Sequence, residues 1–152
     1  MKQTVLFLFM SSLCIGLQAQ EKASFNLSFN HQALSVKNVV LSADFYRNVL
    51  GLQEIINRTE KEGIKWFSLG DGKELHLISL LPGEIKINKA VHLALTTNKF
   101  NEFVGYLDKK KVMYSDWPGA EHKINIRADG IKQIFFQDPD GYWIEVNSVL
   151  QK

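Results

Sequence analysis

This sequence contains almost no cysteine. Cys14 is the only one among 152 residues, and it lies in an apolar stretch near the N-terminus. If that stretch is removed on export, the mature chain has no thiol, which excludes disulfide bonds, a cysteine nucleophile and thiol redox chemistry. Lipid attachment at Cys14 is the alternative, although Leu13 is a poor residue immediately before a lipidated cysteine.

The sequence also lacks an excess of either charge. There are 18 lysine and arginine residues against 16 aspartate and glutamate residues, and the net charge of +2 is too small to indicate binding of nucleic acid. The basic run Lys109 to Lys111 is interpreted as the solvated end of a helix. With 45% hydrophobic and 11% aromatic residues, the composition is that of a globular protein, either one domain or two small modules that share a core.

No apolar run in the sequence is long enough for a transmembrane helix. The run from Val5 to Leu17 is short and interrupted, follows the positively charged Lys2, and ends near Ala19, a small residue suited to cleavage. We therefore predict a secretory signal peptide at residues 1–19, followed by a tether at residues 20–29. The protein is expected to be exported to the periplasm or the extracellular space, without a membrane span.

The rest of the chain repeats one pattern of elements. Alternating apolar residues predict strands, and apolar residues at helical spacing predict helices. Each half then consists of a strand, a helix and three strands, which makes the halves diverged copies of one unit. The first module, 30–81, has predicted strands at 31–36, 53–58, 64–69 and 74–81. The second module, 90–150, has predicted strands at 91–97, 112–115, 131–137 and 142–148, with a loop over 116–130.

Asparagine residues mark the start of both predicted helices. The side chains of Asn38 and Asn98 can each accept hydrogen bonds from the first free backbone amides of the helix that follows. Gly51 is suited to end the first helix, because glycine readily adopts the left-handed conformation found there. The pair Pro82-Gly83 then begins a link between the modules.

Three of the four histidines and one glutamate fall on matching positions of the two modules. Because side chains alternate across a strand, each of these residues is expected to point away from the aliphatic row of its own strand. A single histidine in such a place is most simply a hydrogen-bonded core or surface residue. Because three histidines occupy the same position relative to the aliphatic row of their strands, a common role is favoured. Imidazole nitrogens and carboxylate oxygens bind divalent metal ions. The predicted metal ligands are His31, His76, His92 and Glu145.

The donor set narrows the choice of metal. Three imidazoles favour Zn, Ni, Co or Fe over Mg or Mn. The small neighbours Ala33 and Ala94 leave room for a small-molecule substrate. The fourth histidine, His122, lies in the predicted loop and not on a predicted strand. It is interpreted as solvated, with a lid residue as the alternative. Arg127 and Lys132 are also interpreted as solvated, with contact to a substrate carboxylate as the alternative. The sequence leaves open whether the donors meet within one chain or across two.

Several stretches resemble one known superfamily. Residues 31–36 and 42–52 closely resemble the first signature of glyoxalase I, except that Gln32 replaces the usual aliphatic residue or threonine. Residues 91–95 and 138–145 resemble its second half. Over nearly all of the predicted mature chain, the sequence is similar to the vicinal oxygen chelate superfamily. That superfamily includes glyoxalase I, bleomycin-resistance and fosfomycin-resistance proteins, extradiol dioxygenases and an acyl-CoA epimerase.

This resemblance implies an α+β fold in which two βαβββ modules form curled mixed sheets around a metal-binding cleft. In the superfamily, the metal ligands come from the first and last strand of each module. Carried onto this sequence, those positions are again His31, His76, His92 and Glu145. Members often place the cleft between subunits, so a homodimer is expected.

The implied function is that of a metal-dependent lyase or isomerase of the lactoylglutathione lyase type, acting on a small oxygenated substrate through a metal-stabilised enediolate. Glu145 would serve as both ligand and base, and His76 is the alternative proton carrier. Phe135, Tyr142 and Trp143 are expected to wall the cleft. The alternative function is an exported module that binds and sequesters a small molecule without turnover, and a purely structural domain is the third.

Several departures count against particular members of the superfamily. Bacterial glyoxalase I usually has a glutamate where His76 stands, so this chain would have one negative ligand instead of two. Extradiol dioxygenases have a tyrosine in place of Phe135, and phenylalanine cannot donate a proton. The phosphonate-binding residues of fosfomycin-modifying enzymes correspond to Asn125, Asp129 and Phe135, which disfavours that activity. Bleomycin-resistance proteins bind their drug without metal ligands, so the full donor set argues against that function.

Overall fold

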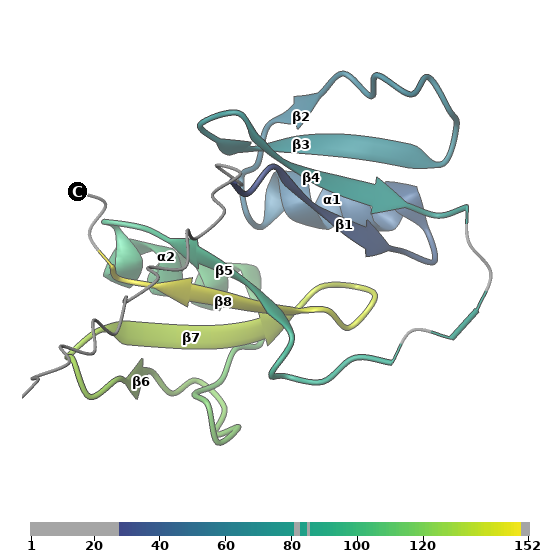
Figure 1. The fold of residues 1–152 in the computed structure, drawn as a ribbon. Helices are drawn as coiled ribbons and strands as arrows, with labels where there is room; N and C mark the ends of the chain where they lie inside the picture. Colours follow the sequence, from purple (N-terminus) through teal and green to yellow (C-terminus); the bar gives the residue numbers. More distant parts are fainter. Residues whose placement is uncertain (1–27, 81–82, 85, 150–152) are drawn as a thin grey trace, which may run out of the picture.

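The fold comes from a computed structural model, in which residues 28–80, 83–84 and 86–149 are described. The predicted signal peptide, residues 1–19, and the predicted tether up to residue 27 lie outside the described residues. Two four-stranded sheets, each accompanied by a helix, form the two halves of the chain (Figure 1).

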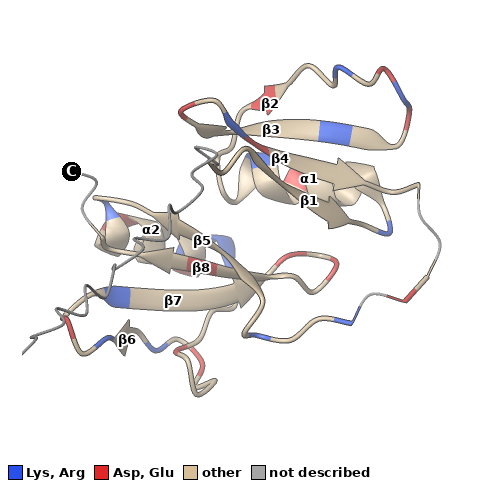
Figure 2. Ribbon diagram, in the orientation of Figure 1, with Lys and Arg blue, Asp and Glu red and all other residues tan. Residues whose placement is uncertain are grey.

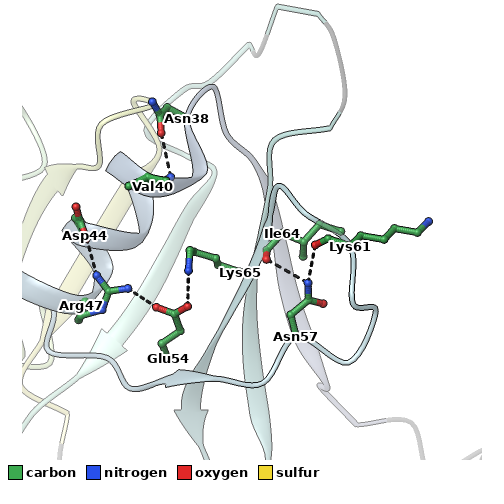
Figure 3. A network of polar contacts seen from close by, with 9 residues as sticks. All are labelled: Asn38, Val40, Asp44, Arg47, Glu54, Asn57, Lys61, Ile64 and Lys65. Carbon is green, nitrogen blue, oxygen red and sulfur yellow. Dashed lines mark hydrogen bonds and ion pairs between the residues drawn. The ribbon is translucent and has the colours of Figure 1, made fainter.

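The first module combines a mixed sheet with one helix. Its elements are β1 (His31–Ser35), α1 (Val39–Asn48), β2 (Glu54–Ile55), β3 (Ile64–Gly70) and β4 (Lys73–Ile78). The strands lie in the order β1-β4-β3-β2, with β1 parallel to β4 and the other neighbours antiparallel. The side chain of Asn38 accepts hydrogen bonds from the backbone amides of Val40 (3.0 Å) and Leu41 (3.1 Å), which confirms the predicted helix cap (Figure 3).

The second module repeats this topology. Its elements are β5 (His92–Thr96), α2 (Phe100–Lys110), β6 (Asn125–Ile126), β7 (Lys132–Gln137) and β8 (Trp143–Asn147). The strands lie in the order β5-β8-β7-β6, with β5 parallel to β8 and the other neighbours antiparallel. The predicted α+β fold of two βαβββ modules is therefore confirmed.

The prediction of a strand at 112–115 is wrong. In this segment only Ser115 pairs, through isolated bridges to Glu121 and Phe135. The second strand of the module is β6, inside the predicted loop over 116–130, where its backbone pairs with β7. The apolar residues of 112–115 serve packing instead, because Tyr114 is buried in the core.

The start of α2 also differs from the prediction. The capping residue is Lys99, whose side chain makes no capping hydrogen bond, so the predicted cap at Asn98 is wrong. The chain enters the helix through a turn in which Oγ1 of Thr97 accepts a hydrogen bond from the backbone amide of Lys99 (3.0 Å). This side-chain contact forms one residue earlier than expected.

The edge strand β2 is shorter than the predicted strand at 53–58. Asn57 bends the chain there, because its side-chain amide donates to two backbone carbonyls of the turn and strand that follow, at 2.9 and 3.2 Å (Figure 3). The carboxylate of Glu54 still anchors the edge, since it accepts hydrogen bonds from Arg47 and from Nζ of Lys65, the latter at 2.6 Å (Figure 3). Polar contacts thus hold a strand that is only two residues long.

Both modules contribute to one hydrophobic core. Phe136 of β7 lies near both helices, since its ring centroid is 6.4 Å from that of Phe45 in α1 and 6.2 Å from that of Phe103 in α2. The most deeply buried members of this core come from the sheets and helices of both modules: Tyr46, Phe67, Leu75, Leu77, Leu107, Ile134, Phe136 and Ile144. Burial of a large apolar side chain contributes about 1.5–3 kcal/mol. This shared core is therefore the main attraction between the modules.

A turn of the second module also binds α1 and the segment just before it. Oδ2 of Asp138 accepts a hydrogen bond from Oη of Tyr46 (2.8 Å), and both residues are buried. Asp140 accepts hydrogen bonds from Oγ of Ser42 (2.6 Å) and from the backbone amide of Lys37 (2.7 Å). Burial raises the pKa of Tyr46, and the adjacent Asp138 carboxylate raises it further; burial also raises the pKa of Asp138. These contacts set the placement of one module on the other.

Among the described residues, both signs of charge occur in each module (Figure 2). Lysine and arginine residues alternate with aspartate and glutamate residues along the loops of both modules (Figure 2), in line with the net charge of +2. Within the described residues, no helix combines the length and apolarity needed to cross a membrane.

Candidate functional site

The predicted metal ligands lie on sheet faces that turn away from the shared core. His76 stands between Leu75 and Leu77, both fully buried in that core. Glu145 likewise stands between two buried aliphatic residues of β8. Because side chains alternate along a strand, His76 and Glu145 occupy the opposite faces of their sheets.

The two modules place their donors in the same register. His31 lies two residues before the partner of His76 on the neighbouring parallel strand. In the second module, His92 lies two residues before the partner of Glu145 on the neighbouring parallel strand. That partner is an alanine in both modules. Each module therefore presents one pair of donors on two adjacent strands.

In the second module, His92 and Glu145 face each other. Nε2 of His92 lies 3.3 Å from Oε2 of Glu145. Nδ1 of His92 lies 3.0 Å from the backbone carbonyl oxygen of Lys89, which can only accept a hydrogen bond, so Nδ1 carries a hydrogen. In the neutral ring, Nε2 then presents its lone pair to the carboxylate.

The carboxylate of Glu145 is held from its other side. Nδ2 of Asn147 donates a hydrogen bond to Oε1 of Glu145 at 2.7 Å, and both residues are buried. Oδ1 of Asn147 accepts a hydrogen bond from the backbone amide of Val149 (3.2 Å), which determines the orientation of the side-chain amide. Oε2 of Glu145 is consequently left to face His92.

Two lone-pair atoms this close repel each other unless a cation lies between them. A shared proton or a metal ion removes that repulsion. Donor atoms at about 2.0–2.1 Å from a tetrahedral zinc ion are about 3.3 Å apart, and the separation of His92 Nε2 from Glu145 Oε2 is 3.3 Å. The pair therefore has the chemistry and the spacing of two ligands of one divalent ion.

In the first module, the two histidines are stacked. The ring centroids of His31 and His76 are 4.3 Å apart, with 15° between the ring planes. The ring of His76 also stacks on Trp66, at 4.0 Å and 6°. The guanidinium carbon of Arg58 lies 4.4 Å from the Trp66 ring. The three rings thus form one column, with Arg58 at the end next to Trp66.

Glu74 supports this column. Nε2 of His76 donates a hydrogen bond to Glu74 at 2.8 Å, and the same carboxylate accepts two hydrogen bonds from Arg58, at 2.7 and 2.9 Å. The hydrogen bond from His76, followed by those from Arg58, lowers the pKa of Glu74. Nδ1 of His31 donates to Oδ1 of Asn30 at 2.7 Å. The nitrogens that keep a lone pair in the neutral rings are therefore Nε2 of His31 and Nδ1 of His76.

The four donors form two separate pairs in the chain. Among residues 28–149 as far as the structure describes them, no three histidine, cysteine, aspartate or glutamate side chains come close enough together to hold a metal ion. The structure brings His31 to His76 and His92 to Glu145, but it does not bring the pairs together. Convergence of all four donors stays a prediction for an assembly of two copies.

Aromatic side chains border the second pair. Phe135 is buried opposite Glu145, and its ring centroid lies 5.8 Å from that of His92. The ring of Trp117 lies 6.4 Å from that of His92 and 5.3 Å from that of Phe135. Trp143 and His92 both line a cavity of about 110 Å³ between the modules. Of the predicted wall residues, Phe135 and Trp143 therefore lie beside a donor.

The other predicted contact residues have polar partners elsewhere. Tyr142 lines the same cavity, but its hydroxyl donates to a backbone carbonyl of β1 at 3.0 Å. Arg127 pairs with a neighbouring carboxylate at 2.5 Å, and Nζ of Lys132 donates to a side-chain amide of α2 at 3.2 Å. His122 is exposed and lies 3.3 Å from a carboxylate of α2. Arg127 and His122 are exposed, which agrees with their interpretation as solvated residues, whereas Lys132 is half-buried.

Sequence reasoning missed three supporting residues, Glu74, Asn147 and Lys89. Glu74 lies two positions before His76, and Asn147 lies two positions after Glu145, so each shares the sheet face of the donor that it supports. Strand alternation contained that signal. Lys89 lies in an irregular segment before β5, where no periodicity marks it.

Comparisons with known proteins show which family the chain resembles. A model of the Glyoxalase/Bleomycin resistance protein/Dioxygenase superfamily matches residues 28–146. Metallothiol transferase FosB of Staphylococcus haemolyticus is 30% identical over 123 residues, which cover 78% of this chain and 81% of that protein. The uncharacterized protein YwbC of Bacillus subtilis is 27% identical over 125 residues, covering 76% of this chain and 93% of that protein.

A solved structure gives an independent comparison of the fold. Lactoylglutathione lyase from Agrobacterium tumefaciens matches with a TM-score of 0.61 and 16% identity, over 80% of this chain and 92% of that chain. At this level of identity the likeness concerns the fold. It agrees with the paired modules seen in Figure 1.

Proposed function

We propose that this chain, which belongs to the Glyoxalase/Bleomycin resistance protein/Dioxygenase superfamily, is a metal-dependent lyase or isomerase for a small molecule with two adjacent oxygen atoms. The similarity to a metallothiol transferase supports a metal-dependent reaction. The mature chain predicted from the sequence has no thiol of its own, so any thiol in the reaction would come from the substrate or a co-substrate.

The observation that carries this proposal is the pair formed by His92 and Glu145. Each side chain is oriented by a partner, the carbonyl of Lys89 or the amide of Asn147, and their remaining lone pairs meet at 3.3 Å. Support of this kind is typical of metal ligands. A purely structural pair in its neutral form would point the imidazole N–H toward the carboxylate, whereas here the N–H of the neutral ring points to Lys89.

A second copy of the chain would complete the site. The stacked histidines of one copy would meet His92 and Glu145 of the other, because both donor faces turn away from the core of their own chain. Phe29 and Val91 precede the donor strands and are 54% and 67% exposed. These two apolar side chains are available for contact with a second copy. We therefore include a homodimer in the proposed function.

The residues present fit a divalent ion such as Zn, Ni, Co or Fe, held by imidazole and carboxylate donors. When bound, such an ion would polarise the two substrate oxygens and make the adjacent carbon more acidic. Oε2 of Glu145 would have to leave the ion to accept the proton from that carbon, while Asn147 holds Oε1. His76, whose Nε2 hydrogen is directed to Glu74, is the second group able to hold a proton.

Metal removal tests this function. Protein stripped with a chelator should lose activity on thiol–methylglyoxal adducts and regain it with Ni, Co or Zn. Addition of a thiol to an epoxide, assayed in parallel, would identify a transferase reaction like that named for the Staphylococcus relative. The exposed residue His122 provides a control, since His122→Ala should retain both metal and activity.

Three outcomes would count against the proposed enzyme. Activity that ignores the chelator would show that the reaction needs no metal. A Glu145→Ala variant that still binds a full equivalent of metal would show that the ion is held elsewhere. Tight binding of a small molecule without product after long incubation would favour a sequestration module.

We further propose that the protein acts after export. The apolar run from Val5 to Leu17 and the small residue Ala19 support a cleaved signal peptide. Glutathione and methylglyoxal meet mainly in the cytoplasm, so the natural substrate of an exported enzyme would be another oxygenated molecule, and the thiol–methylglyoxal adducts serve as assay substrates. N-terminal sequencing of the protein recovered from the periplasmic fraction should give a chain that begins near residue 20.

A further inference from the structure

The ammonium group of Lys89 lies in a cage of aromatic rings beside the candidate site. Its Nζ is 4.7 Å from the ring centre of Phe135, 4.8 Å from that of Trp143 and 5.6 Å from that of Trp117. We propose that this cage is a binding site for a primary ammonium group, which Lys89 fills from within the chain, and that the filled site holds Trp117 beside His92.

Three oxygen acceptors complete the cage. Nζ of Lys89 donates hydrogen bonds to the backbone carbonyls of Asp116 (2.5 Å) and Trp117 (3.0 Å) and to Oγ of Ser115 (3.3 Å). A lysine ammonium has three N–H donors, so each donor has an acceptor. The faces of aromatic rings attract a cation within about 6 Å. The cage thus satisfies both the hydrogen bonds and the charge of a primary ammonium.

This environment distinguishes Lys89 from a lysine that binds an anion. Its three donors are used inside the chain, so none is left for a substrate carboxylate or phosphate. Burial lowers the pKa of Lys89, and the nearby carboxylate of Asp116 opposes that change. Lys65 is a useful contrast, because its Nζ forms an ordinary ion pair with Glu54 at 2.6 Å.

Lys89 is connected to His92 in two ways. Its backbone carbonyl accepts the hydrogen bond from Nδ1 of His92. Its ammonium holds the backbone at Asp116 and Trp117, and the ring of Trp117 lies 6.4 Å from that of His92. Because Trp117 is 47% exposed, we expect its position to depend on these contacts. The proposed ammonium site does not depend on the proposed function, because none of these contacts requires a metal ion.

Chemical rescue tests the ammonium site. Lys89→Ala empties the cage but keeps the backbone carbonyl that holds His92. The variant should melt about 5–10 °C lower, because hydrogen bonds to a charged group are lost. Acrylamide should quench Trp117 more strongly, with the signal of this residue obtained by difference from Trp117→Phe. Ethylammonium should bind saturably and reverse both changes, and tetramethylammonium, which has no N–H donor, should reverse them less.

Two further variants keep the test decisive. Lys89→Met leaves an apolar chain among the rings without N–H donors, so it should expose Trp117 and should not respond to ethylammonium. Lys65→Ala removes an ion-paired lysine outside the cage and should not respond either. Unchanged quenching of Trp117 in both Lys89 variants, or an equal ethylammonium response in Lys65→Ala, would overturn the proposal.

Metal binding separates this proposal from the proposed function. Calorimetry should give the Lys89 variants nearly the metal affinity of the wild-type protein, because the carbonyl that orients His92 is still present. Wild-type protein that binds no metal would count against the proposed function alone, since rescue by ethylammonium does not require a metal ion.

Discussion

The two modules have the same strand order and the same donor register, yet they support their donors differently. In the first module, His76 is supported by Glu74, two positions before it on β4. In the second, Glu145 is supported by Asn147, two positions after it on β8. A carboxylate next to an imidazole keeps a hydrogen on Nε2, whereas an amide next to a carboxylate leaves one oxygen free for a cation. One fold thus carries two chemical environments.

The aromatic residues that pair with the donors on the neighbouring strands also differ between the modules. Trp66 pairs with His76 on the neighbouring strand β3 and covers the face of that imidazole, with 4.0 Å between the ring centroids. Phe135, the partner of Glu145, lies edge-on to His92, with 88° between the rings. The first module therefore packs its histidine between rings, while the second leaves its donors facing each other. We expect the second module to contribute more of the metal affinity.

The largest effect should follow from removing either donor of the second module. Loss of a residue that only supports a ligand usually costs about 10–100-fold in metal affinity, so Glu145→Ala and His92→Ala should each cost more than that. His31→Ala should cost less, because its ring is exposed. Titration calorimetry with Zn or Ni measures the affinities, and His122→Ala is the control. Equal losses for His31→Ala and Glu145→Ala would remove the proposed difference between the modules.

The supporting residues provide a sharper comparison with a smaller effect. Asn147→Ala should lower metal affinity about tenfold, because Oε1 of Glu145 loses the donor that orients it. Glu74→Gln can still accept the hydrogen bond from His76, so it should lower affinity less and reduce kcat instead. Calorimetry and steady-state kinetics on the two variants separate these effects. Identical changes of metal affinity and kcat in both variants would show that Asn147 and Glu74 have the same effect on the site.

The hydrogen bond between Tyr46 and Asp138, which joins the two modules, should contribute measurably to the free energy of unfolding. Tyr46→Phe leaves Oδ2 of Asp138 without its hydrogen-bond donor in a buried position, which should cost about 1–3 kcal/mol. Tyr106→Phe removes a less buried hydrogen bond, from Oη of Tyr106 to the carbonyl of Asn48 (2.5 Å), and should cost less. Urea unfolding measures both. Tyr106→Phe as the more damaging change would contradict the importance given to the turn at Asp138.

The features that were predictable from the sequence are those decided within a few residues. Alternation around His76 and Glu145 is local, so the sheet face of each donor followed from its neighbours. The cap at Asn38 is local as well. In contrast, β6 has two residues, too few to show any period, and its position depends on pairing with β7.

The arrangement of the donors in space depends on distant contacts. The two donor pairs stay separate within the described part of the chain, while the modules pack through pairs such as Phe45 with Phe136 and Tyr46 with Asp138. These residues are about 90 positions apart in the sequence, and no local pattern joins them. Sequence reasoning therefore identified the donor pairs but left their assembly open.

The edge strands of the two sheets provide the smallest effect and the most specific contrast. The carboxylate of Glu54 anchors β2 through hydrogen bonds from Arg47 and Lys65 (Figure 3). Nδ2 of Asn125 in β6 donates to Oε1 of Gln133 at 2.8 Å, a contact between neutral amides. Burial alone would raise the pKa of Glu54, but the hydrogen bonds from Lys65 and Arg47 outweigh burial and lower it.

This difference gives the two edges a different dependence on pH. Because the folded-state pKa of Glu54 lies below its ordinary value of 4.5, its contribution to stability is complete above that pH and is lost as the pH falls through the lower folded-state value. Glu54→Gln should reduce the free energy of unfolding by about 0.5–1 kcal/mol at pH 7, since the ion pairs are partly exposed. The difference from wild type should shrink in acid, whereas the cost of Asn125→Ala should stay constant because neither amide titrates. Urea unfolding at several pH values below 7 measures both, and a constant cost for Glu54→Gln would mean that packing, and not charge, holds the edge of the first sheet.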